Sequence, residues 1–156
     1  MHLLADVPDL IEPIGRMRCA EWGSADEVQK WISTTGREAG RDELPVTWVA
    51  VDGTAAALGA VALGPSDVAG RPELMPCVWG MVVRADRRGL GIGRLLLQRL
   101  ERFAVGRGYP AVWVATGPSA VGYYERCGWQ RAEELRTGIL LRKRVLPADA
   151  PAGGIL

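Results

Sequence analysis

The stretch 77–106 constrains the fold of this 156-residue chain more than any other. It reads CVWGMVVRADRRGLGIGRLLLQRLERFAVG: an apolar run, an arginine- and glycine-rich turn, and an amphipathic segment. An almost wholly apolar run is typical of a central strand that is covered on both faces, which predicts a strand over 76–83. Backbone N–H groups exposed by small residues at the start of a helix form a concave anion site, and the helix dipole adds positive potential there. The stretch therefore predicts a phosphate-binding turn between a strand and a helix.

The segment after the glycines has helical spacing, and a further apolar run at 111–115 follows it. A strand, a helix and a second strand in this order predict a βαβ unit with parallel strands. The helical spacing predicts that the side chains facing the core are Leu95, Leu96, Leu100, Phe103 and Ala104.

Upstream, two short helices and a hairpin are predicted. The first helix has an apolar stripe that includes Ile14 and ends near Trp22–Gly23, and the second begins at a capping box over 24–27. Two β-prone runs, 46–51 and 55–63, flank Asp52-Gly53-Thr54. Gly53 is expected to supply the positive φ of a tight turn between antiparallel strands.

Downstream, a short helix from about 116 to 128 and a final hairpin, with strands at 129–135 and 139–145, are predicted. The length of 156 residues fits one compact domain. We expect residues 1–146 to form that domain and residues 147–156 to form a flexible tail.

Composition excludes several kinds of function. A net charge of +1 gives no reason to expect nucleic acid or an anionic membrane as a partner. His2, the only histidine, is expected at a frayed terminus, so neither His-ligated metal nor Ser/His/Asp chemistry is expected. The three cysteines suggest neither a disulfide framework nor a zinc site. With no signal peptide and no apolar run of about 18 residues, a cytoplasmic location is expected.

Two other phosphate-binding folds fit the glycine-rich turn less well. A P-loop needs a lysine and a Ser or Thr after its glycines, and neither follows here. A Rossmann turn lies near the first strand of its domain and is followed about 20 residues later by an acidic residue. Two helices and three strands precede this turn, and the next strand ends at Ala115–Thr116. A Rossmann protein is therefore a remote alternative.

Two motifs resemble those of the GCN5-related N-acetyltransferases, which transfer acetyl from acetyl-CoA to amines. Residues 88–93, RGLGIG, match the family pattern [RQ]xxGx[GA], and 123–129, YYERCGW, match a second family motif on a later helix. The resemblance covers roughly residues 3–145. It implies an α/β (α+β) fold: a central mixed, mostly antiparallel sheet of six to seven strands, about four flanking helices, and strands four and five parallel and splayed.

The resemblance also implies a site. Tyr124 would be the general acid that protonates the CoA thiolate. Backbone amides in two groups would hold acetyl-CoA, the cosubstrate, with no metal. The first group would hold the acetyl carbonyl and pantetheine arm, and the second the pyrophosphate: Met81, Val82 and Val83, then Arg88, Gly89, Leu90, Gly91, Ile92, Gly93 and Arg94.

The general base is less well defined. Cys77 occupies a strand position where some relatives place a glutamate or histidine. Strand alternation puts Cys77, Trp79 and Met81 on one face. Without a histidine to activate it, Cys77 is expected to be a buried, inert thiol. Glu73 is the candidate base, acting through water, with Asp67 or water alone as alternatives.

Together these features predict an N-acetyltransferase that joins acetyl to the primary amine of a small molecule by direct attack. The alternative from another class is a non-catalytic acyl-CoA-binding regulatory module on the same fold. Neither nucleic acid nor membrane is an expected partner. The sequence leaves open the amine, the acyl-chain length and a homodimeric state.

Overall fold

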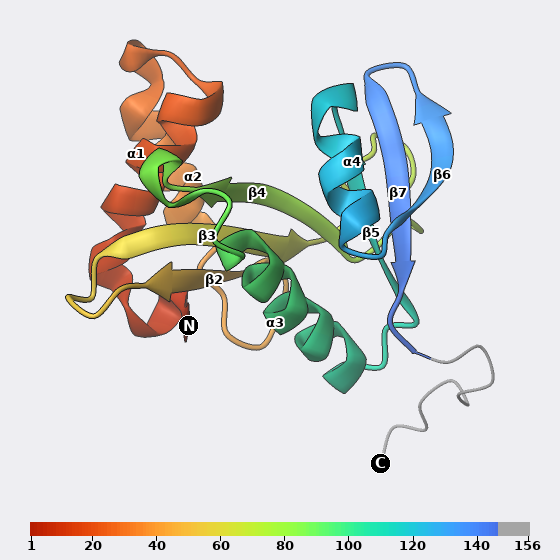
Figure 1. The fold of residues 1–156 in the computed structure, drawn as a ribbon, viewed down its shortest axis with the longest axis horizontal. Helices are drawn as coiled ribbons and strands as arrows, with labels where there is room; N and C mark the ends of the chain where they lie inside the picture. The colour runs from red at the N-terminus through yellow and green to blue at the C-terminus, as the bar shows by residue number, and fades with distance from the viewer. Residues whose placement is uncertain (147–156) are drawn as a thin grey trace. The chain divides into compact units, whose positions relative to one another are not determined.

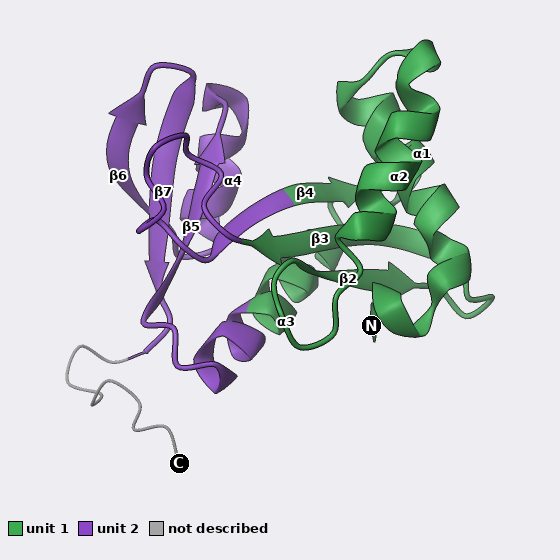
Figure 2. Ribbon diagram, turned by 180° about the vertical axis from the view of Figure 1, so that it is seen from behind, with its two compact units in different colours: residues 1–64, 80–100 green, residues 65–79, 101–156 purple. Residues whose placement is uncertain are grey.

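The computed structural model describes residues 1–146 and divides them between two compact units (Figure 2). Unit 1 comprises residues 1–64 and 80–100, and unit 2 comprises residues 65–79 and the chain from residue 101 onward. One strand and one helix contribute residues to both units. The predicted tail, 147–156, lies outside the described residues.

Figure 1 labels the four α-helices and the strands from β2 to β7. The strands are β1 (His2–Leu3), β2 (Val46–Val51), β3 (Ala57–Gly64), β4 (Cys77–Val83), β5 (Ala111–Thr116), β6 (Gln130–Leu135) and β7 (Gly138–Arg144). The α-helices are α1 (Ile11–Trp22), α2 (Val28–Arg37), α3 (Ile92–Gly106) and α4 (Pro118–Arg126). Short 3₁₀ helices are η1 (Leu4–Asp6), η2 (Pro8–Leu10), η3 (Ala25–Glu27) and η4 (Ala85–Arg87).

The seven strands form one mixed sheet in the order β1-β2-β3-β4-β5-β7-β6. β4 and β5 are parallel, whereas β1 with β2, β2 with β3, β5 with β7 and β6 with β7 are antiparallel. The ladder between β4 and β5 pairs Cys77 with Trp113 and Val78 with Val114. These findings confirm the predicted sheet and its parallel βαβ unit.

In the part of the chain that the structure describes, no helix combines the length and the hydropathy that crossing a membrane requires.

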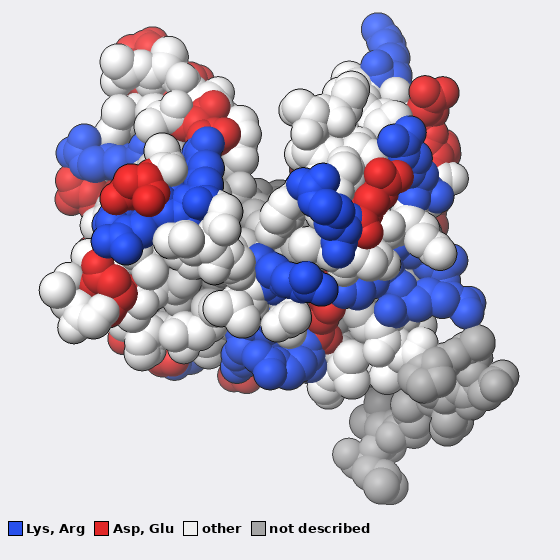
Figure 3. Space-filling view, viewed as in Figure 1, with Lys and Arg blue, Asp and Glu red and all other residues white. Residues whose placement is uncertain are grey.

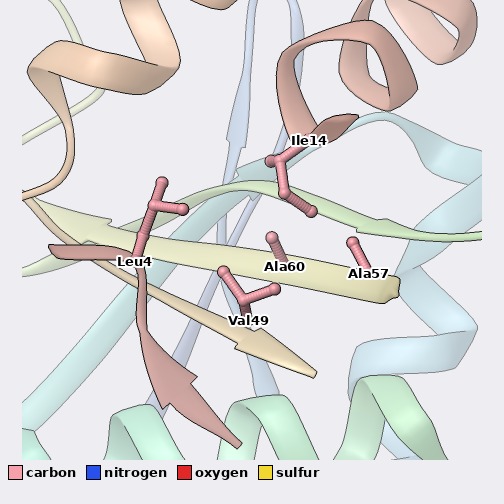
Figure 4. Packing of buried hydrophobic residues seen from close by; sticks show 5 residues of the cluster. All are labelled: Leu4, Ile14, Val49, Ala57 and Ala60. Atoms are coloured by element: carbon pink, nitrogen blue, oxygen red, sulfur yellow. The ribbon is translucent and has the colours of Figure 1, made fainter. Parts of the chain in front are cut away.

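Unit 1 has an apolar core where α1 packs on its strands. Ile14 of α1 and Leu4 meet Val49 of β2 and Ala57 and Ala60 of β3 (Figure 4). All five are buried. The small alanines let the helix approach the sheet closely, and the apolar stripe predicted for the first helix supplies Ile14.

The other face of unit 1 belongs to α3. Trp48, which precedes Val49 on β2, points to the opposite face because side chains alternate along a strand. It is wholly buried, and the guanidinium of Arg99 on α3 lies 6.0 Å from its ring. Unit 1 therefore has helices on both faces of its strands, which explains why β2 and β3 are buried almost throughout.

Unit 2 contains the paired residues of β4 and β5, the final hairpin and α4. The Lys143 ammonium on β7 donates to the Glu101 carboxylate at 2.9 Å and to the Cys127 carbonyl at 2.8 Å. This one side chain connects β7 to the last turns of α3 and to the end of α4. A largely buried, fully bonded lysine is an effective tether because its removal would leave a carboxylate unpaired.

Two sequence predictions about packing are wrong. His2 is paired with Val49 in β1 rather than frayed, since the first residues add an edge strand to β2. Leu95 is 54% exposed, and the buried face of α3 includes Leu96, Leu97 and Leu100 instead. Side chains three and four apart share a helix face, so a stripe through 93, 96, 97 and 100 leaves position 95 outside it.

The turn between β2 and β3 also differs from its prediction. Gly53 is not in the left-handed region, whereas Ala55 has φ 65°. The Asp52 carboxylate accepts the backbone N–H groups of Thr54 at 2.8 Å and Ala56 at 3.1 Å. An aspartate that bonds the backbone ahead of it makes a longer loop, and this shifts the left-handed residue two positions along the chain.

This turn gives a stability prediction. The left-handed conformation costs a non-glycine residue about 1 to 2 kcal/mol, and glycine avoids this cost. Glycine also has more conformational freedom in the unfolded chain, which offsets part of the gain in stability. We therefore expect Ala55→Gly to raise the free energy of unfolding by about 0.5 to 1 kcal/mol, measured by urea denaturation. Gly53→Ala is the control and should also stabilise, because a Cβ there meets no atom within 4 Å. Destabilisation by both changes would show that Gly53 carries the positive φ.

Candidate functional site

The glycine turn forms an open surface of backbone at the start of α3. Gly89 and Gly91 have φ 76° and 82°, and a Cβ at either would meet no atom within 4 Å. Glycine is required at both positions by conformation rather than by crowding. Helix α3 begins at Ile92, so its first N–H groups lie beside this exposed backbone. Backbone donors and the helix dipole could act together on an anion at this position, which stays a prediction.

Arg88 connects the glycine turn to the end of β4. Its Nε donates to the Val83 carbonyl at 3.0 Å, and its Nη2 donates to the Glu21 carboxylate at 2.7 Å. Both predicted groups of backbone donors, 81–83 and 88–94, lie in unit 1. The bond from Arg88 to Val83 connects one group to the other. Arg88 orders the turn through contacts within the protein.

The charges around the turn are partly neutralised. Arg84 forms a two-bond pair with Asp86, at 2.6 and 3.1 Å, and Arg87 lies 3.7 Å from the same carboxylate. Figure 3 shows basic side chains interspersed with acidic ones on the visible face. Arg94 is exposed on the first turn of α3. The net charge at the turn is still positive, but Asp86 and Glu21 make it smaller than the four arginines at 84, 87, 88 and 94 alone would give.

The middle of β4 departs from regular extended structure at Gly80, which has φ 58°. Regular alternation of side chains holds only for continuous extended backbone. The prediction that Cys77, Trp79 and Met81 share one face therefore loses its basis beyond Trp79. Residues 81–83 form the last part of the same strand and follow this left-handed residue.

Arg18, which the sequence analysis did not single out, packs against this interruption. It is 1% exposed, and its Nε donates to the Gly80 carbonyl at 3.0 Å. A sequence signal was present: Arg18 lies four residues after Ile14, on the stripe of α1 that faces the core. A charged side chain on an apolar stripe is rarely buried without a specific partner.

Tyr124 is held rigidly within unit 2. Its ring contacts those of Tyr123 and Trp129 edge to face, at 5.6 and 5.5 Å. Gly128, with φ 89°, ends α4, and the Trp129 N–H donates to the Tyr124 carbonyl at 3.0 Å. This glycine-terminated end follows the Schellman pattern. Burial, with a smaller effect of Cys127, raises the pKa of Tyr124, so its phenol stays protonated at neutral pH.

Cys77 is wholly buried, and its thiol donates to the Leu74 carbonyl at 3.1 Å. Burial raises the pKa of the Cys77 thiol, which disfavours the reactive thiolate. The expected burial of this cysteine is thus confirmed, and its environment is that of an inert thiol.

Glu73 lies in the loop before β4 and is exposed. Arg71 donates to its carboxylate at 2.5 Å and also contacts Glu133 of β6. The hydrogen bond from Arg71 lowers the pKa of Glu73, so the carboxylate is ionised but is a weaker proton acceptor than an isolated glutamate.

Within residues 1–146, no group of three or more His, Cys, Asp or Glu side chains is arranged to hold a metal ion.

Several solved structures are similar to this chain. An aminoglycoside 6'-N-acetyltransferase complexed with coenzyme A is 16% identical, with a TM-score of 0.71 over 92% of this chain and 94% of that one. An aminoglycoside 6'-acetyltransferase type Ii is 19% identical, with a TM-score of 0.72 over the same shares. A GNAT family N-acetyltransferase (YhbS) from Escherichia coli in complex with CoA is 25% identical, with a TM-score of 0.65 over 88% and 77%. The chain shares their fold.

No curated protein sequence matches the chain significantly. A family model described as the acetyltransferase (GNAT) family matches residues 12–129. The matched region includes the interrupted strand, the glycine turn and the tyrosine motif on α4. The match covers well over half of the sequence, and the chain therefore belongs to the GNAT acetyltransferase family.

Proposed function

We propose that this protein is an N-acetyltransferase that moves acetyl from acetyl-CoA to the primary amine of a small molecule. The observation that carries the proposal is the exposed backbone at Gly89 and Gly91, at the start of α3, in a chain of this family. Such a turn suits the pyrophosphate of CoA because it offers several N–H donors and a positive helix end. Two of the similar structures are described as complexes with coenzyme A.

In the proposed reaction, the neutral amine attacks the thioester carbon, a C–N bond forms, and the C–S bond breaks. The amine loses one proton, and the sulfur leaves as a thiolate that takes up one proton. Backbone N–H groups of 81–83 are the proposed donors to the pantetheine arm and to the carbonyl oxygen, on which negative charge develops. Backbone donors suit this task because they are already fixed in place before the reaction.

Tyr124 is the proposed donor to the departing sulfur. Its raised pKa keeps the phenol protonated, so it is always able to donate a hydrogen bond. We therefore assign to Tyr124 a hydrogen bond that stabilises the developing thiolate. The phenol transfers its proton to the sulfur while it takes up another proton from water, so that no buried phenolate is left.

Glu73 is the proposed acceptor of the amine's proton, through water. Its ion pair with Arg71 leaves it ionised and limits its basicity. A weak base contributes less to the rate than one whose pKa lies near the working pH. We therefore assign to Glu73 a smaller contribution to the rate than to Tyr124.

The cofactor proposal predicts that Gly91→Ala weakens acetyl-CoA binding. A side chain at this left-handed position costs about 1 to 2 kcal/mol, so the turn shifts and binding should weaken by roughly tenfold. Isothermal titration calorimetry measures the effect. Gly106→Ala, at the other end of α3, is the matched control: it is not left-handed and has open space, so binding should not change.

Failure of the wild-type protein to bind acetyl-CoA would overturn the proposed function. Protection by NAD but not by CoA in thermal unfolding would instead favour a dinucleotide-binding protein. Binding of acetyl-CoA without release of free thiol, across a panel of small amines that includes an aminoglycoside, would favour the non-catalytic acyl-CoA-binding module.

The proposed acid predicts that Tyr124→Phe lowers kcat by roughly 10²-fold or more, because general acid catalysis typically contributes that much. The Kd of acetyl-CoA should change little, since Phe retains the ring contacts with Trp129. Tyr123→Phe removes a neighbouring hydroxyl from the same helix and should leave kcat close to wild type. Thiol release measures both variants, and an equal loss in the two would mean that the hydroxyl of Tyr124 has no special role.

Glu73→Gln tests the proposed base. We expect kcat/KM to fall by about tenfold or less, because a carboxylate of lowered pKa is a weak base. Since Glu73 stays ionised above its ordinary pKa of about 4.3, the acid limb of the wild-type pH profile should reflect deprotonation of the amine. Asp67→Asn is the comparison: a loss there but not at residue 73 would move the assignment to Asp67, and no loss in either would leave water as the acceptor.

A further inference from the structure

Arg18 is a buried cation whose contacts all lie within unit 1. Its Nε donates to the Gly80 carbonyl at 3.0 Å, and its Nη1 donates to the Thr35 hydroxyl at 3.2 Å and to the Glu38 carboxylate at 2.7 Å. Thr35 lies on α2, and Glu38 immediately follows that helix. One guanidinium therefore joins the two N-terminal helices to the middle of β4.

The backbone around Arg18 leaves it little freedom. The helices α1 and α2 meet at Gly15, where a Cβ would lie 2.6 Å from the Cα of Ile32. Arg18 follows Gly15 by three residues, just as Thr35 follows Ile32, so the same close approach brings Arg18 to α2. The hydroxyl of Thr47 on β2 donates to the backbone carbonyl of Glu38 at 3.0 Å and so holds the main chain of this residue against the sheet.

Arg18 contacts Gly80 in two ways at once. A Cβ built on Gly80 would lie 2.7 Å from both Cζ and Nη2 of Arg18, so the guanidinium fills the space that a side chain would take. The same guanidinium holds the Gly80 carbonyl. A peptide unit is planar and trans, so its carbonyl and the next N–H point in opposite directions. Fixing the Gly80 carbonyl therefore fixes the direction of the Met81 N–H.

Stability does not account for this arrangement. Nη2 of Arg18 is buried and has no hydrogen-bond partner among the described residues, and an unsatisfied buried donor costs about 1 to 3 kcal/mol. Buried ion pairs are often no more stable than well-packed apolar replacements. Burial lowers the pKa of Arg18, and Glu38 opposes that shift through its charge and hydrogen bond. The pair thus maintains a buried charge in a setting where apolar replacements are often at least as stable.

We propose that Arg18 is a positioning residue for the acetyl-CoA arm. By filling the side-chain position of Gly80 and holding its carbonyl, Arg18 sets the left-handed backbone there and aims the N–H of Met81. Glu38 and Thr35 hold the guanidinium in place. The inference rests on the proposed function, because it concerns the backbone donors of 81–83 that would bind the thioester arm.

The main test is the double variant Arg18→Met with Glu38→Gln, which removes both charges together and leaves no unpaired buried carboxylate. Its matched control is Arg16→Met with Glu12→Gln, which removes an exposed ion pair, 2.8 Å long, from the same helix. Hydrogen exchange of the amides of 80–83 reports on the backbone directly. Calorimetry gives the Kd of acetyl-CoA, and thiol release gives kcat and KM, all below the Tm of each variant.

We expect the double variant at 18 and 38 to show faster exchange at 80–83 and a rise of at least about tenfold in both the Kd and the KM of acetyl-CoA, because small misplacements of binding groups are costly. The control should match wild type. Arg18→Lys should give an intermediate result, since an ammonium can hold Glu38 but lacks the planar fork that also covers Gly80.

Gly80→Ala tests the steric contact and keeps the proposal testable if the double variant does not fold. Its effect on the Kd should be smaller in an Arg18→Ala, Glu38→Gln background than in wild type, because the space is then vacant. If Gly80→Ala changes the Kd equally in both backgrounds, the proposal is wrong. It is also wrong if the double variant at 18 and 38 folds with a lowered Tm but has wild-type exchange rates, Kd and KM, because Arg18 would then have a purely structural role. Absence of acetyl-CoA binding by wild type would defeat the proposed function instead, and the exchange rates at 80–83 would still decide whether Arg18 sets this backbone.

Discussion

Regular secondary structure uses up the backbone N–H groups that a site made of backbone donors requires. Helices and sheets pair these groups internally, so a chain that binds a ligand through them must interrupt its own hydrogen bonding at defined places. From β4 to the start of α3, three glycines are in the left-handed region: Gly80 within the strand, and Gly89 and Gly91 in the turn. Arg18 packs against Gly80, and Arg88 connects the turn to the end of β4.

The three left-handed glycines are stabilised in two different ways. Gly89 and Gly91 have open space around them, and the Arg88 side chain fixes the turn from outside through Val83 and Glu21. Gly80 is instead enclosed, with a guanidinium lying where its side chain would be. A turn that is proposed to bind an anion has to remain accessible, whereas a left-handed residue within a strand has to be supported by its surroundings to persist.

Charge at the glycine turn is moderated rather than maximised. Arg84 and Arg87 share Asp86, and Arg88 is engaged with Glu21. Pairs that are this exposed contribute little to stability, but they hold the side chains near the turn and reduce the repulsion between neighbouring cations. In the proposed anion site, backbone donors and the start of α3 are then the specific part, and the arginines supply a diffuse positive field.

The sequence by itself determined the order of the elements, the parallel pair, the glycine turn and the family motifs, because these depend on local periodicity and on residues with special backbone freedom. Only the tertiary structure placed the left-handed residue at Ala55 instead of Gly53, exposed Leu95, and paired His2 with Val49. It also decided that Arg18 is buried against Gly80, 62 residues away. Such contacts join distant parts of the chain, and the residues near an arginine in the sequence do not indicate which distant carbonyl will accept its hydrogen bond.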